Sequence, residues 1–124
     1  MHTALKTVVT AASTILLAGT VLVTPTAVLA GDEASVIEQG KKLAFDRKKG
    51  NCLACHMIAG GELPGNIGPP LIAMKARFPD KAALRAQIFD ARTKNPNTIM
   101  IPFGPHAVLT PEEIDKVTEF IYSL

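Results

Sequence analysis

The chain of 124 residues has few aromatic side chains and no strong excess of charge of either sign. It contains five Phe, one Tyr and no Trp, and its formal net charge is +2. Near-neutral charge disfavours nucleic acid as a partner. A chain this small buries only about 60% of its unfolded surface, so with so little aromatic bulk it usually needs a covalent staple or a cofactor. The length allows one domain, and no internal repeat or low-complexity tract divides it.

A long apolar run occurs only near the N-terminus, from Val8 to Leu29. The first 30 residues contain one lysine and no acidic residue, and the run ends in Val28-Leu29-Ala30, which is small enough at both key positions for signal peptidase. This pattern predicts a cleaved secretory signal peptide over residues 1–30 and a mature domain over residues 31–124. The domain is then expected in the periplasm with no membrane span after processing. A retained membrane anchor is the alternative, and a proline and several threonines late in the run disfavour it.

Two cysteines allow at most one disulfide, but their spacing indicates a different use. They lie in the string Cys52-Leu53-Ala54-Cys55-His56. Cysteines three residues apart share one side of a helical turn, so both sulfurs can reach the two vinyl groups along one haem edge. The following histidine can then bind the iron as the proximal ligand. C-x-x-C-H is the attachment signature of c-type haem, and it predicts one covalently bound haem c.

Three other uses of these cysteines remain as alternatives. A periplasmic thiol–disulfide oxidoreductase would expect a βαβ setting, and the sequence predicts no strand. A zinc site needs four ligands, and beyond Cys52, Cys55 and His56 only His106 remains in the mature chain. A structural disulfide would close a very short loop and add little stability.

Apolar periodicity predicts three helices. The first covers Ala34–Arg47, and the second follows Asp80 as N-cap and covers Lys81–Thr93. The third begins at the capping box Thr110-Pro111-Glu112-Glu113 and runs to Leu124. The fold class is therefore all-α.

Two loops rich in proline and glycine, residues 57–70 and 95–105, separate the helices, and the second encloses Met100. Met57 adjoins the proximal histidine and cannot reach the opposite haem face, and Met74 is expected to fill the core. Met100 is far enough along the chain to approach from the distal side, and it is the favoured sixth ligand. His106 or an open position remains the alternative. A thioether ligand raises the reduction potential, and two filled axial positions limit the iron to electron transfer.

Two further features have a functional and a structural interpretation. The proximal histidine needs an acceptor for its second ring nitrogen, and the backbone carbonyl of Pro69, within Gly68-Pro69-Pro70-Leu71, is the candidate. These prolines can equally serve only to turn the chain. The basic residues Arg47, Lys48 and Lys49 precede the haem motif, where they form either a docking surface or a solvated face.

The chain resembles the class I c-type cytochromes, and more closely the SoxX family, the monohaem subunits of the thiosulfate-oxidising SoxAX complex. The likeness covers nearly all of the mature chain. It lies in these strings: Ala44-Phe45-Asp46-Arg47, Gly50-Asn51, Leu63-Pro64-Gly65, Ile67-Gly68-Pro69-Pro70-Leu71, Arg77-Phe78-Pro79-Asp80, Leu84-Arg85-Ala86-Gln87-Ile88, Asn95-Pro96, Pro102-Phe103-Gly104 and Leu109-Thr110. One position departs from the pattern, since Ile101 follows Met100 where relatives often have proline.

The resemblance implies a class I cytochrome c fold of three to four main helices, with long loops around one covalently attached haem. It implies that Cys52 and Cys55 hold the haem and that His56 and Met100 bind the iron. The implied partner is a SoxA-type haem-bearing subunit, and the complex joins thiosulfate to a cysteine of the SoxYZ carrier as an L-cysteine S-thiosulfotransferase. This chain would pass the electrons to a downstream cytochrome or other acceptor and would have no catalytic residue of its own. The alternative is a freely diffusing monohaem carrier.

Overall fold

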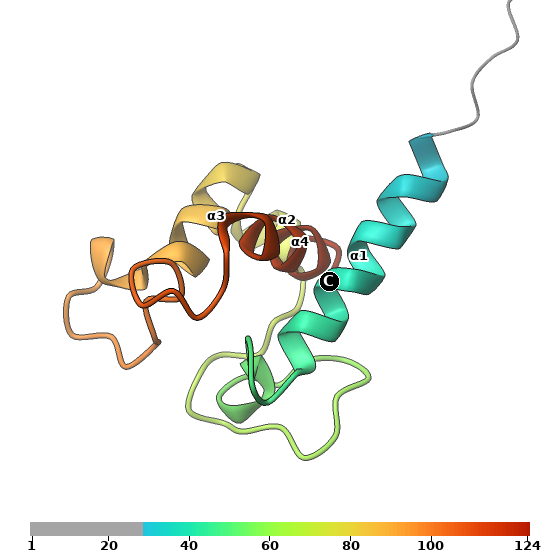
Figure 1. Cartoon of the computed structure of the whole chain (residues 1–124). Coiled ribbons are helices and arrows are strands. Elements are labelled where there is room, and N and C mark those ends of the chain that lie inside the picture. The colour runs from blue at the N-terminus through green and yellow to red at the C-terminus, as the bar shows by residue number, and fades with distance from the viewer. Residues whose placement is uncertain (1–28) are drawn as a thin grey trace, which may run out of the picture.

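The computed structural model describes residues 29–124 (Figure 1), so most of the expected signal peptide lies outside the described residues. The helices are α1 (Leu29–Phe45), α2 (Met74–Arg77), α3 (Lys81–Phe89) and α4 (Pro111–Tyr122), with 3₁₀ turns at Cys52–Ala54 and Ala91–Thr93. Residues 29–124 contain no strand, as the all-α prediction requires. No helix in this part of the chain has the length and apolar character needed to cross a membrane.

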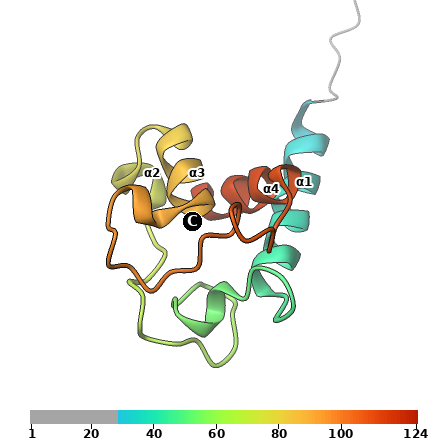
Figure 2. The same cartoon turned by 60° about the vertical axis from the view of Figure 1, so that its left-hand side comes forward.

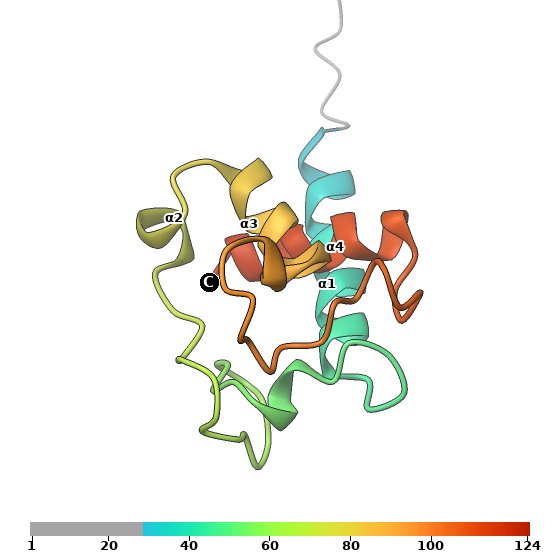
Figure 3. The same ribbon diagram turned by 90° about the vertical axis from the view of Figure 1, so that its left-hand side faces the viewer.

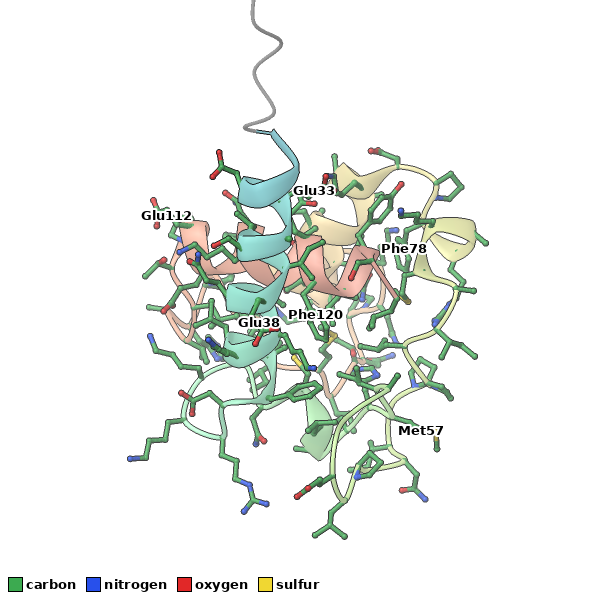
Figure 4. All side chains as sticks on the ribbon, turned by 90° about the vertical axis from the view of Figure 1, so that its right-hand side faces the viewer. Glu33, Glu38, Met57, Phe78, Glu112 and Phe120 are labelled. Carbon is green, nitrogen blue, oxygen red and sulfur yellow. The ribbon has the colours of Figure 1, made fainter. Side chains whose placement is uncertain are left out.

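Helices α1 and α4 cross (Figures 1 and 2), and theirs is the most extensive contact between helices in residues 29–124. Gly40 of α1 is buried at the crossing, where an added Cβ would overlap the backbone carbonyl oxygen of Lys116 and lie 2.9 Å from Phe120 Cβ. The rings of Phe45 and Phe120 meet edge to face with their centroids 5.7 Å apart. Figure 4 shows Phe120 beside α1 in the interior. Because Gly40 has no side chain, α1 and α4 can approach this closely.

Helix α1 differs from its expected bounds. It begins at Leu29, five residues before the expected Ala34, and ends at Phe45 before the expected Arg47. The expected boundary between signal peptide and domain, after Ala30, therefore falls inside the first turn of α1.

Helix α4 begins as the sequence predicts. Thr110 Oγ1 accepts the backbone N–H of Glu113 at 3.2 Å, and Glu113 Oε2 accepts the N–H of Thr110 at 3.0 Å, which confirms the capping box. Lys49 Nζ also donates to Glu113 Oε1 at 2.9 Å. The ammonium of Lys49, followed by the N–H of Thr110, lowers the pKa of the Glu113 carboxyl. This ion pair joins the segment before the haem motif to the start of α4.

Helix α3 is shorter than predicted. Asp80 caps it as expected, because its Oδ1 accepts the N–H of Ala82 at 2.9 Å. The helix ends at Phe89, however, because Asp90 adopts an extended backbone with φ −154°. The Asp90 carboxylate then accepts both the N–H and the guanidinium of Arg92, at 3.1 and 2.8 Å, and caps a separate 3₁₀ turn. The prediction of one helix to Thr93 was therefore wrong at Asp90.

The short helix α2 was not predicted. Its first residue, Met74, is 1% exposed, and its N–H donates to the carbonyl of Leu124 at 2.9 Å. Methionine filling the core at this position agrees with the sequence interpretation.

Figures 2 and 3 show that the loop after α1 and the loop after α3 lie at the same end of the molecule, below the helices. The helices thus bring the two proline-rich loops to one place.

Candidate functional site

A cavity of about 340 Å³ lies where the two loops meet the helices. This volume is in the range of small-molecule and cofactor sites, roughly 300–1,000 Å³. Helix α3 contributes Leu84 and Ile88 to its wall, and α4 contributes Val117 and Ile121. Most of the lining is apolar. The chemically distinctive lining residues are Cys52, Cys55 and His56, from the 3₁₀ turn and the residues directly after it, and Met100, from the loop after α3.

The ring of His56 is held in place through one nitrogen. Its Nδ1 lies 2.7 Å from the carbonyl oxygen of Pro69. Because a carbonyl can only accept, Nδ1 carries the proton and Nε2 keeps its lone pair. Gly68 lies against the same ring, where an added Cβ would be 2.6 Å from Nδ1. The arrangement is the one expected of a metal-binding imidazole whose second nitrogen is hydrogen-bonded to the protein.

The segment that carries Pro69 is fixed on both sides. The N–H of Gly68 donates to the carbonyl of Cys55 at 2.8 Å, and the N–H of Leu71 donates to that of Met57 at 2.9 Å. Residues 68–71 thus run alongside residues 55–57. The segment that contains the prolines therefore contacts the haem motif as well as turning the chain.

Arg77 adds a contact that the sequence analysis missed. Its Nη1 donates to the carbonyl of Pro70 at 2.8 Å and lies 3.5 Å from the sulfur of Met74. Arg77 also lines the cavity. The sequence feature that could have indicated this contact is the spacing of three residues between Met74 and Arg77. That spacing brings the two side chains together only if the segment is known to be helical.

The two cysteines lie on one side of a tight turn. Asn51 adopts the left-handed conformation with φ 46°, and Cys52–Ala54 then forms a 3₁₀ turn. Side chains three residues apart eclipse in a 3₁₀ turn, so Cys52 and Cys55 share a face. The N–H of His56 donates to the carbonyl of Cys52 at 2.9 Å and places the histidine directly after this face.

The chemistry of the thiols disfavours the alternative uses. The cysteines are not joined in a disulfide, and burial raises the pKa of the Cys52 thiol to about 11. A thiol–disulfide enzyme needs the opposite, a lowered pKa that yields thiolate at neutral pH. Within residues 29–124, no group of three or more His, Cys, Asp or Glu side chains is arranged to hold a metal ion.

Of the sixth-ligand candidates, the structure brings two methionines to the cavity. Met100 is half-buried and lines it. Met74 also lines it but belongs to the core. Met57 is 54% exposed, lies outside the lining, and is seen at the edge of the molecule in Figure 4. His106 is exposed and does not line the cavity either.

The basic residues before the haem motif divide into two kinds. Arg47 and Lys48 are exposed and available to a partner, whereas Lys49 is paired with Glu113. Any docking surface in this region therefore depends on the first two.

Comparisons with known proteins identify the family of this chain. The family described as cytochrome c oxidase, cbb3-type, subunit III matches residues 36–121, a stretch that contains all four distinctive lining residues. An uncharacterised lipoprotein of Aquifex aeolicus (strain VF5) is 31% identical over 101 residues. That match covers 74% of this chain but only 47% of the relative's length. The chain belongs to the cbb3-type subunit III family of c-type cytochromes, and it is a class I cytochrome c whose all-α domain binds haem for electron transfer.

Proposed function

We propose that the cavity holds one haem c attached through thioethers to Cys52 and Cys55, with His56 Nε2 and the Met100 sulfur as the axial ligands. The observation that carries this proposal is that these four residues, from two segments far apart in sequence, line one largely apolar cavity. When bound, the haem supplies an iron that takes up and gives off single electrons.

The chain's own residues account for the rest of the function. The Pro69 carbonyl holds the His56 ring in the tautomer that leaves Nε2 free to bind. The Met100 thioether favours the ferrous state and raises the reduction potential. The apolar walls of α3 and α4 would limit access of water, and His56 and Met100 together would leave no place on the iron for a substrate. The site is therefore suited to pass electrons without breaking bonds.

Replacing Met100 by alanine tests the distal ligand. Haem should remain attached, because the cysteines are untouched, while the reduction potential falls and the ferric iron binds added imidazole or cyanide. Intact mass, absorption spectra and potentiometry measure the three effects. Met57→Ala is the matched control, since this exposed methionine adjoins His56 but lies outside the cavity. An unchanged potential in the Met100 variant would assign the sixth ligand elsewhere.

We further propose that the chain is the electron-transfer subunit of a periplasmic, SoxAX-like complex. The sequence strings shared with the SoxX family support this role. In such a complex, a bond forms between thiosulfate and a cysteine sulfur of a SoxYZ-type carrier, and a proton and a pair of electrons leave. This chain would receive electrons from the haem of a SoxA-type partner and deliver them to a downstream acceptor. The alternative is a freely diffusing carrier, and the family match supports haem-based electron transfer in either role.

Purification from the native periplasm separates these two roles. A tag on the C-terminus retains this chain, and covalent haem is then quantified against protein mass for every chain that co-purifies. The complex predicts one haem on this chain together with a second haem-bearing subunit. One haem on a solitary chain would favour the diffusible carrier, and a colourless chain with two titratable thiols would point to the thiol–disulfide alternative.

A further inference from the structure

The segment that carries Met100 has few attachments of its own. Thr98 begins it, with its N–H bonded to the carbonyl three residues earlier, and Phe103, which is 5% exposed, fixes its other end in the core. Between these points the side chains of Ile99 and Ile101 are 77% and 45% exposed. Two hydrogen bonds hold this stretch: the Met100 N–H donates to Thr98 Oγ1 at 3.1 Å, and the Pro102 carbonyl accepts the N–H of His106 at 3.1 Å.

We infer that Thr98 is a positioning residue for the distal ligand. Its hydroxyl oxygen holds the backbone of Met100, and both residues line the cavity. A threonine that accepts the N–H two residues ahead closes a small turn, which fixes the backbone without help from a helix. The inference rests on the proposed role of Met100 and adds the reason why the methionine stays in place.

The consequence concerns how firmly the sulfur is retained. Without the bond, the Met100 N–H loses its partner and the backbone gains freedom, so the sulfur leaves the iron more often. An added ligand binds only while the sulfur is away, so its apparent affinity reports the fraction of time that the position is open. Imidazole is a suitable probe because it competes for the same position.

Thr98→Val tests the inference, because valine keeps the shape and removes the oxygen. We expect ferric Thr98→Val to bind imidazole about five-fold more tightly than the wild type, the factor that loss of one typical hydrogen bond gives. Thr98→Ser keeps the acceptor and should match the wild type. Thr93→Val is the control: Thr93 also makes a local bond, from Oγ1 to the Asp90 carbonyl at 3.0 Å, but lies outside the cavity lining.

The same titration in the Met100→Ala background distinguishes the possible failures. Thr98→Val should have no further effect there, because Thr98 acts through Met100. If Met100→Ala tightens imidazole binding and Thr98→Val alone does not, the positioning role is wrong and the distal ligand stands. A serine variant that behaves like valine would also overturn the role, since serine keeps the oxygen on which the role depends. If Met100→Ala itself binds imidazole like the wild type, the ligand assignment and the inference fail together.

Discussion

Replacing Gly68 by alanine should displace the proximal histidine while leaving haem attached to the chain. Gly68 has no left-handed backbone conformation that only glycine could adopt, so the chain itself accepts alanine. The added methyl group would instead lie 2.6 Å from Nδ1 and 2.9 Å from Nε2 of the His56 ring. These distances are well inside van der Waals contact, so the ring has to move. Any such movement lengthens its 2.7 Å contact with the Pro69 carbonyl.

The expected result is a loss of the low-spin spectrum and a lower reduction potential, with unchanged covalent mass. Axial ligation sets haem potentials over a range of roughly 0.8 V, so a disturbed proximal ligand should produce a large shift. Asn66→Ala is the control, because Asn66 is an exposed neighbour in the same loop. A Gly68→Ala protein with the wild-type spectrum and potential would show that His56 does not bind the iron in the orientation described here.

Replacing Gly40 by alanine should strongly destabilise the whole domain. Glycine inside a helix costs about 1 kcal/mol relative to alanine, so at an open site this change would stabilise α1. At Gly40 the new Cβ would lie 2.6 Å from the carbonyl carbon of Lys116, overlap its oxygen and approach Phe120. The obstacle is backbone, which no rotamer change relieves, so α1 and α4 have to separate. Overpacking costs about 1–3 kcal/mol even where side chains can adjust, and this site should lie at or above the upper end.

Denaturant unfolding of the haem-bearing protein measures the effect as a shift in midpoint at constant slope. Gln39→Ala is the matched control, since Gln39 is the exposed neighbour of Gly40 on α1. The direction in which the unfolding midpoint shifts decides whether Gly40 lies at a close contact between α1 and α4. A Gly40→Ala protein more stable than the wild type would mean that α1 and α4 do not pack as closely as the structure shows.

Local chemistry explains which parts of the fold could be predicted from sequence. The capping box at Thr110 and the N-cap at Asp80 use atoms within three residues of each other, and both were found where expected. The end of α3 was missed, although it is also local. Apolar periodicity continues past Asp90, and only the pairing of its carboxylate with Arg92 ends the helix.

The residues of the candidate site also divide into those that the local sequence indicates and those that depend on distant segments. The haem motif is contiguous, so the sequence alone indicated Cys52, Cys55 and His56. Choosing Met100 required an argument from chain length, and the cavity now places it with the others. The roles of Arg77 and Gly68 could not be found beforehand, because each depends on where a distant segment passes. A glycine that makes room for an imidazole looks the same in sequence as a glycine in any turn.

The ion pair between Lys49 and Glu113 affects where this chain can accept insertions during evolution. The two residues are 64 positions apart, and their pairing closes the chain just before the haem motif and just at the start of α4. Both haem loops thus lie within one large ring whose ends are already joined. Doubling the length of such a ring costs only about 0.6 kcal/mol in closure entropy. New residues can therefore be inserted into the exposed parts of these loops at little cost in closure entropy, while the α1–α4 crossing has almost no freedom to vary.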